Sequence, residues 1–344
     1  MTIDTSWIPT GLEPVALRLA RADQKAFEVG KLSLDWSRAD GNGPLTVHQI
    51  EASPGTLSLV VAHVRLIPPA VSMLFSEAIN HLRAAIDNTV FHLVVDEHGP
   101  LADRLARKVA MPIYNEPSKF DNWLRENDKV GLATLGEGSK LATRIRALQP
   151  FEDALSVPSM SDSLGSLMGV KPVGEHPLLL LQAYSNEDKH RSIRTSAARA
   201  MIQRDDEPFF TSDRSMRPVQ PGDVLATTAI GKLVMVDSNA AVHVERPGGT
   251  AWVAPNHELD RLRTHVAGVI IPTLITGSAI PRAFPPTIDL GDTGQTYRER
   301  IDEGTWETAH ERMATISKST LLAALSAQPT VPPIVSSSHG HIPS

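Results

Sequence analysis

Hydrophobic positions recur at three- and four-residue steps along much of the chain, which is the pattern of amphipathic helices. The first such stretch covers residues 12–39 and includes Leu12, Val15 and Leu19. A stronger helix is predicted over residues 70–95, directly after Pro68-Pro69, because proline suits the first turn of a helix. Further helices are predicted at residues 101–107, 117–127, 139–148, from 177 onwards, at 257–276 and within 295–326.

Alternating or continuously apolar runs predict strands in two parts of the chain. Residues 46–52 and 56–67 flank the turn Ser53-Pro54-Gly55 and predict a β-hairpin. Residues 109–113 are also strand-like, whereas residues 153–174 have the composition of a loop. After residue 192, runs rich in Val, Ile, Thr and Ala predict strands, with Asp237-Ser238-Asn239 among the turns between them. These strands are expected at residues 193–203, 224–230, 232–237, 240–246 and 250–254.

The order of these elements predicts an α+β fold with a helical N-terminal part, an antiparallel β-rich part and C-terminal helices. We expect a mainly helical domain with a small hairpin over residues 1–192 and a β-rich segment with its packing helix over 193–280. A linker and helices follow at 281–328, and the Pro- and Ser-rich tail at 329–344 is expected to be disordered. Residues 192–193 lack a Pro-, Gly- or Ser-rich linker, so the β-rich part should pack against the helical part.

Composition narrows the class of protein. The chain has 344 residues, of which 41% are hydrophobic, and it contains no cysteine. These values argue against a disordered chain and exclude disulfide scaffolds and thiolate metal sites. An apolar run of about 18 residues, which would span a membrane, does not occur, so we expect a cytoplasmic protein without a membrane partner. With 33 Lys+Arg against 39 Asp+Glu, broad nucleic-acid binding is disfavoured. No cofactor motif is found, and no cofactor is expected.

Two polar helical segments carry the candidate chemistry. Both adjoin strongly apolar runs, so their polar ends are expected to converge on one site. Surface helices usually carry Lys, Glu and Gln, and an arc rich in His and Asn differs from that pattern. The alternative is a solvated face with weak ion pairs, aided in the second segment by cations at a helix C-terminus. The first segment carries Glu77, Asn80, His81, Arg83, Asp87, Asn88 and His92, and the second carries Asn186, Glu187, Asp188, Lys189, His190 and Arg191.

Four motifs occur in a fixed order: a helix with Glu77, Asn80, Leu82-Arg83 and Ile86-Asp87, then Met111-Pro112-Ile113, Leu148-Gln149-Pro150-Phe151, and Asn186 to Arg191. This order resembles an uncharacterised bacterial and phage family with the helix E-x-x-[NH]-x-L-R-x-A-[LI]-D and the motif N-x-x-D-K-H-R. The resemblance covers residues 60–195 and implies no assigned activity.

The helix of that family contains R-x-x-x-x-H, which is similar to the motif of the HEPN superfamily of helical ribonucleases. That similarity implies metal-independent RNA cleavage by Arg and His from paired helices, often across a homodimer. Arg83 matches the arginine, but the histidine position is Asn88 in this chain. Asparagine does not transfer protons at neutral pH, so His81, His92 or His190 would have to replace the histidine.

Three hypotheses follow, and they leave open whether the chain is an enzyme. The first is a HEPN-like or phage-defence-related ribonuclease. Arg83 would stabilise the phosphate charge, His190, His81 or His92 would move the proton, and Asp87 would orient them. RNA would be bound by Glu77, Asn80, Asn88, Asn186, Asp188, Lys189 and Arg191.

The second hypothesis is a non-catalytic binding or interaction protein, in which the same cluster is a structural network or a pocket for a small anionic ligand. The third is a metal site formed by Glu77, His81, His92, Asp188 and His190. It ranks last, because Glu77 to His81 is one residue longer than the Glu-x-x-His spacing of di-metal bundles, and no metal is expected.

Overall fold

The two longest apolar stripes of the sequence form an antiparallel helix pair at the centre of the protein. These helices are α1 (Glu13–Ser37) and α2 (Ala70–His98). Leu19 and Ala26 of α1 and Leu82 and Ile86 of α2 are almost completely buried. The Trp36 indole at the end of α1 donates to carbonyls just before the start of α2, those of Arg65 and Leu66. The predicted fold class is confirmed: the chain has an α+β fold.

The structure is a computed structural model that describes residues 4–38, 43–190, 196–208, 212–249, 251–281 and 283–326, without the side chains at 189, 190, 196 and 320–326. The tail predicted to be disordered, residues 329–344, lies outside these ranges.

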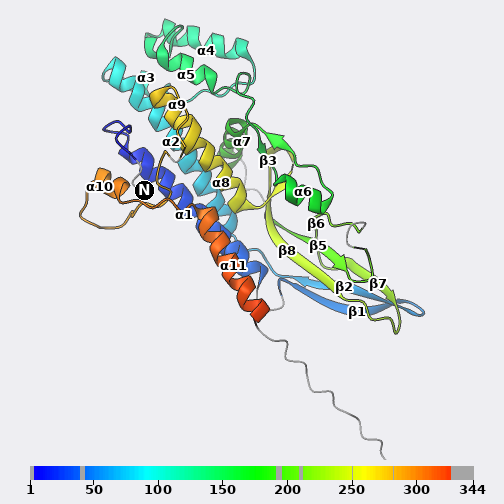
Figure 1. The fold of residues 1–344 in the computed structure, drawn as a ribbon. Helices are drawn as coiled ribbons and strands as arrows, with labels where there is room; N and C mark the ends of the chain where they lie inside the picture. Colours follow the sequence, from blue (N-terminus) through cyan, green and yellow to red (C-terminus); the bar gives the residue numbers. More distant parts are fainter. Residues whose placement is uncertain are drawn as a thin grey trace, which may run out of the picture.

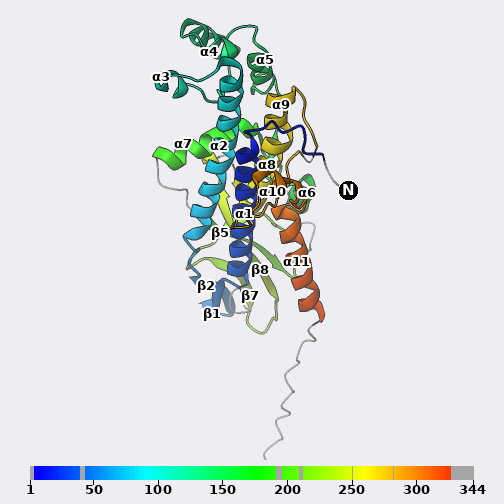
Figure 2. The ribbon, with the colours of Figure 1, turned by 90° about the vertical axis from the view of Figure 1, so that its left-hand side faces the viewer.

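The remaining helices surround the central pair (Figures 1 and 2). Helices α1, α2 and α8 pack side by side, with α4 and α5 at one end and the long strands at the other. The helices other than α1 and α2 are α3 (Asp103–Ala106), α4 (Pro117–Lys129), η2 (Ala133–Leu135), α5 (Lys140–Ala147), α6 (Asp162–Met168), α7 (Pro177–His190), η3 (Pro247–Gly249), α8 (Pro255–His265), η4 (Val266–Ile270), α9 (Ile271–Thr276), α10 (Tyr297–Asp302) and α11 (Ala309–Ser326).

The strands form antiparallel sheets. The predicted hairpin is present, and its second strand pairs with β7, so the sheet β1-β2-β7 joins residues on both sides of position 192. A four-stranded sheet has the order β6-β5-β8-β9, and β8 packs against α1 and α8 as expected. The strands are β1 (Leu45–Ser53), β2 (Thr56–Val64), β3 (Val157–Pro158), β4 (Gly174–Glu175), β5 (Ser196–Arg204), β6 (Arg217–Pro218), β7 (Val224–Ala229), β8 (Val236–Glu245) and β9 (Trp252–Val253).

Several local predictions were wrong. The turn predicted at residues 237–239 does not form: β8 runs through it, because Ser238 and Asn239 pair with Ile202 and Met201 of β5. Residues 153–174, predicted to be a loop, contain α6 and β3. Residues 109–113, predicted to be a strand, form no strand.

The helix predicted over residues 257–276 is continuous, but its winding changes from α-helical to π-helical and back to α-helical. Pro272 lies in the first turn of α9, after the π-helical turn η4. A proline inside a helix leaves the carbonyl four residues earlier without its usual donor. Here that carbonyl belongs to Gly268, and it accepts from the Ile280 amide at 2.9 Å. The hydrogen-bonding defect at Pro272 is therefore satisfied by the segment that follows α9.

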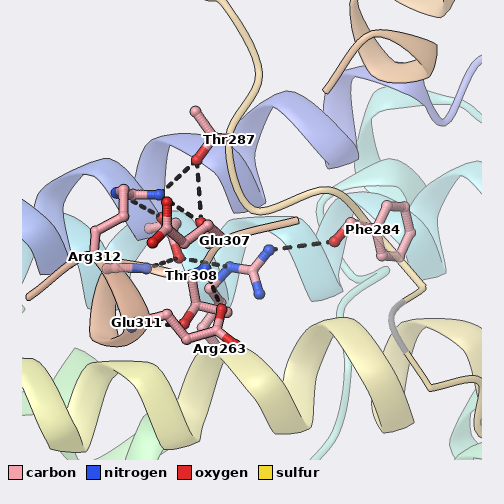
Figure 3. A network of polar contacts seen from close by, with 9 residues as sticks. Arg263, Phe284, Thr287, Glu307, Thr308, Glu311 and Arg312 are labelled. Atoms are coloured by element: carbon pink, nitrogen blue, oxygen red, sulfur yellow. Dashed lines mark hydrogen bonds and ion pairs between the residues drawn. The ribbon is translucent and has the colours of Figure 1, made fainter. Parts of the chain in front are cut away.

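The last helix, α11, is held by a buried carboxylate of α1. Asp23, 1% exposed, accepts hydrogen bonds from the Ala309 amide at 3.0 Å and from Arg312 at 2.7 Å. Arg263 of α8 is also buried, with its Nε 3.4 Å from Asp23. Figure 3 shows Arg263 reaching toward the Phe284 carbonyl and Arg312 toward Thr287. Among the described residues, no helix is long and apolar enough to cross a membrane.

Candidate functional site

The polar arc of α2 divides into two rows. At about 100° per residue, Glu77, His81, Asn88 and His92 follow one line along the helix. Asn80, Arg83 and Asp87 follow a second line, offset from the first by about a third of a turn. We call them the α1-facing row and the α7-facing row, after the contact of Glu77 with Lys25 of α1 and that of Asn80 with Asp188 of α7. The two rows have different partners, so the single predicted arc provides two environments.

In the α7-facing row, Arg83 and Asp87 bind each other and the main chain of Met111. Arg83 Nε lies 3.0 Å from Asp87 Oδ2, and Arg83 Nη2 donates to the Met111 carbonyl at 2.7 Å. The Met111 amide donates to Asp87 Oδ1 at 3.0 Å. The two side chains are 16% and 31% exposed, so the group is largely shielded from solvent. Both peptide groups of Met111 are thereby satisfied without a neighbouring strand.

Gln149 holds the same segment from the opposite side. This side chain is fully buried, and its amide nitrogen donates to the Pro112 carbonyl at 3.0 Å. Its oxygen accepts from the Tyr114 amide at 2.9 Å. Side chains from two separate sequence motifs therefore hold residues 111–114, which explains why this strand-like segment forms no strand. We call Arg83, Asp87 and Gln149 together with this segment the Met111 clamp.

The two polar helical segments do come together, at one contact. The Asn80 amide nitrogen donates to Asp188 Oδ2 at 2.6 Å, which links α2 to the C-terminal half of α7. Asn186 is exposed on α7. The side chains of Lys189 and His190, and all of Arg191, lie outside the described part of the chain.

The α1-facing row contacts different groups. Glu77 forms an ion pair with Lys25 of α1 at 3.1 Å, and Lys25 also binds Glu28 at 3.0 Å. His81 is half-buried, and its Nδ1 atom is buried without a hydrogen-bond partner. Burial lowers the pKa of His81, and the charges of Arg18 and Arg21 lower it further.

The remaining two members of this row lie near its far end. His92 lies against Gly11, where a Cβ atom would come within 2.7 Å of the imidazole ring. Asn88 is exposed. His81 and His92 therefore belong to the row that contacts α1 and its leading residues, whereas Arg83 belongs to the other row.

A small cleft of about 30 Å³, open to solvent, lies between α2, α7 and β8. Asp188, which binds Asn80, is on its rim, and its apolar lining is Phe75, Ile79, Tyr184 and Val244. Tyr184 connects the cleft to the protein interior, because its hydroxyl donates to Glu258 at 3.2 Å. Burial and the negative charge of Glu258 raise the pKa of Tyr184, so this phenol remains protonated at neutral pH. The sequence carries no motif that would have identified this cleft.

A second open cleft, of about 340 Å³, is lined by Asp153, Glu175 and His176. His176 Nδ1 accepts from the Leu178 amide at 3.2 Å, at the start of α7. The proton of this imidazole is thus on Nε2, 3.6 Å from Asp153 Oδ2. Burial lowers the pKa of His176. Because Nδ1 is occupied by the helix start, this histidine is not arranged as a general base. Its position before Pro177, at a predicted helix start, could have indicated a capping role.

The metal hypothesis finds no support within the described ranges. No three His, Asp or Glu side chains gather there in positions that could hold a metal ion. His190, one of the five proposed ligands, lies outside the described side chains.

Comparisons with protein-family models, curated proteins and solved structures found no match to this chain. The resemblance to a bacterial and phage family and the similarity to helical ribonucleases therefore stay predictions from the motifs quoted above.

Proposed function

We propose that this chain is a non-catalytic binding protein in which the polar motif residues hold the fold together. The observation that supports this most directly is the Met111 clamp. Arg83 and Asp87 satisfy the carbonyl and the amide of Met111, and Gln149 bonds the Pro112 carbonyl and the Tyr114 amide. Buried polar networks rigidify a fold when their members are satisfied; in this one Arg83 Nη1 is buried without a hydrogen-bond partner, while the other groups named here are paired.

The arrangement of the candidate residues favours this reading over a ribonuclease. Metal-independent cleavage needs an arginine and a proton-transferring histidine at the same phosphodiester. Arg83 Nε and Nη2 are occupied by Asp87 and Met111, whereas His81 lies in the other row. The surface around the small cleft between α2, α7 and β8, with its apolar lining, is the surface that we assign to the ligand of a binding protein.

The proposal predicts that Arg83→Ala destabilises the protein rather than removing an activity. The substitution leaves Asp87 and the Met111 carbonyl without their partner. We expect the free energy of unfolding to fall by about 1–3 kcal/mol, measured by urea denaturation. Arg125→Ala on α4 is the matched control, because Arg125 is exposed and bonds only within its own helix turn. It should change the free energy of unfolding by less than about 0.5 kcal/mol.

The same preparations should be incubated with single-stranded RNA. We expect no cleavage by the wild-type protein. Cleavage that is lost in both Arg83→Ala and His190→Ala, with unchanged free energies of unfolding, would overturn this proposal and establish the ribonuclease hypothesis.

A further inference from the structure

Two cations, Arg18 and Arg21, lie on α1 where it faces α2, and none of the sequence motifs includes them. The two helices are antiparallel, and three contacts give their register. Lys25 meets Glu77, Gly11 meets His92, and the indole of Trp36 meets the carbonyl of Leu66. In each pair the two residue numbers add to 102 or 103. The same register places Arg21 level with His81 and Arg18 level with Ala84.

Arg18 and Arg21 are cations without a counter-ion in the described structure. Both guanidinium side chains are half-buried. Arg21 donates to the neutral amide oxygen of Gln24 at 2.8 Å. Within the described ranges, no carboxylate pairs with Arg18 or Arg21, whereas Lys25, one turn along α1, binds two carboxylates. The charge of Lys25 is therefore more than neutralised by Glu28 and Glu77, and the two carboxylates bind Lys25 rather than Arg18 or Arg21.

His81 lies beside these two arginines from the opposite helix. The buried Nδ1 atom of its ring lacks a partner, and an unpaired buried polar atom usually indicates a bound water, an ion or a functional role. The effect of both arginine charges on the pKa of His81 agrees with the register. Ala84, level with Arg18, has a small side chain and is half-buried.

We propose that Arg18, Arg21 and His81 form a binding site for a dianionic phosphate group between α1 and α2. Two guanidinium groups match the charge of a phosphate monoester or of inorganic phosphate, and their planar donors suit its oxygens. The imidazole supplies one further hydrogen bond. Asn88, exposed one turn beyond Ala84 on the same row, lies at the end of the site from which a larger ligand would extend.

The phosphate site shares no residue with the Met111 clamp. The proposed phosphate binding and the proposed structural role of the clamp can therefore fail separately. A destabilised Arg83→Ala variant says nothing about phosphate. Loss of phosphate binding in an Arg18 variant, in turn, says nothing about the clamp.

The test is thermal unfolding of the full chain with inorganic phosphate or adenosine 5′-monophosphate, compared with chloride at equal ionic strength. A ligand that binds only the folded state raises the melting temperature, and the rise grows with the logarithm of its concentration relative to its dissociation constant. We expect both phosphate compounds to stabilise the wild-type protein. A stronger effect of the nucleotide would identify a phosphate monoester as the natural source, and equal effects would identify free phosphate.

The decisive variant is the double substitution Arg18→Gln/Arg21→Gln. Without phosphate it should be as stable as the wild type, because it removes two unpaired charges on neighbouring helix turns. Its affinity for phosphate should fall by about tenfold or more, since charge-assisted hydrogen bonds are lost. The matched control is Arg104→Gln/Arg107→Gln, two exposed arginines with the same spacing at α3, which should bind phosphate like the wild type.

A second readout is the His81 imidazole, followed by NMR and assigned with His81→Gln. Phosphate should raise the pKa of His81, because the anion neutralises the arginine charges that lower it. No stabilisation by phosphate in the wild type, an equal loss in the control double variant, or an unchanged His81 titration would each overturn the site.

Discussion

At the scale of single residues, Arg246 and Glu258 form an ion pair in which both charged side chains are almost completely buried. Their side chains are 0% and 1% exposed, and the guanidinium binds the carboxylate through two hydrogen bonds of 2.8 Å. Arg246 also donates to the Val173 carbonyl, and Tyr184 adds a third hydrogen bond to Glu258. The pair supports one wall of the cleft between α2, α7 and β8. Arg246 follows the end of β8, Glu258 belongs to α8, and Tyr184 connects Glu258 to α7.

Removing one of these charges should be costly. Glu258→Gln keeps the shape of the side chain but leaves the Arg246 charge buried without a counter-ion. We expect a loss of about 3 kcal/mol in the free energy of unfolding, measured by chemical denaturation. The matched control is Glu126→Gln, whose ion pair with Lys129 is exposed on both sides and should lower the free energy of unfolding far less, because solvent screens an exposed pair. Similar losses in the two variants would show that burial does not govern the strength of this pair.

At the scale of secondary-structure elements, α11 depends on Asp23 of α1 for its attachment. The Asp23 carboxylate binds the first amide of α11 and the Arg312 side chain within that helix, and Arg312 also lies over the Phe27 ring of α1. An α-helix leaves its first amides without internal partners, so a buried carboxylate at that end both caps the helix and fixes its position on α1.

Asp23→Asn should therefore loosen α11 more than the rest of the fold. The variant removes the negative charge that faces Arg312 and Arg263, and we expect amide protons of residues 309–319 to exchange about tenfold faster or more. Hydrogen exchange followed by mass spectrometry measures this directly, with peptides of α2 as the internal reference. Asp35→Asn on the same helix, which removes only an exposed pair with Lys31, should leave exchange unchanged. Equal acceleration in α2 and α11 would contradict a local role for Asp23.

At the scale of the whole molecule, buried neutral histidines link stability to pH. Burial lowers the pKa of His243 and of His265 to about 4. An unfolded histidine titrates near 6.5. Between about pH 6.5 and pH 4 the unfolded chain therefore takes up protons that the folded chain does not. Above about pH 6.5 these histidines are neutral in both states, and their contribution to the stability of the fold is fully present. As the pH falls toward 4, that contribution is lost, because protonation of the histidines favours the unfolded chain.

His265→Gln tests this linkage. Each such histidine should contribute a slope of about 1.4 kcal/mol per pH unit between pH 6 and pH 4.5. Urea denaturation at several pH values should show a smaller loss on acidification in the variant than in the wild type. His48→Gln, at an exposed position of β1, is the control and should follow the wild-type curve. Parallel curves for wild type and His265→Gln would exclude this residue as a source of acid sensitivity.

The sequence by itself determined the elements whose pattern is local. The apolar stripes of α1 and α2, the hairpin at Ser53-Pro54-Gly55 and the α+β class all follow from periodicity and turn residues, which depend on neighbours a few positions away. The two polar segments were expected to converge on one site, and within the described residues Asn80 of the first is in contact with Asp188 of the second.

Only the tertiary structure decided what each polar side chain binds. Arg83 and His81 are two residues apart, yet one holds the Met111 carbonyl and the other faces Arg21 of α1. Arg18 and Arg21 look like ordinary polar positions of an amphipathic helix until the register with α2 places them beside an imidazole. The physical reason is that a hydrogen bond or an ion pair depends on the distance between two groups in space. Helical periodicity gives the direction of a side chain, but its partner comes from packing between segments that are far apart in the chain.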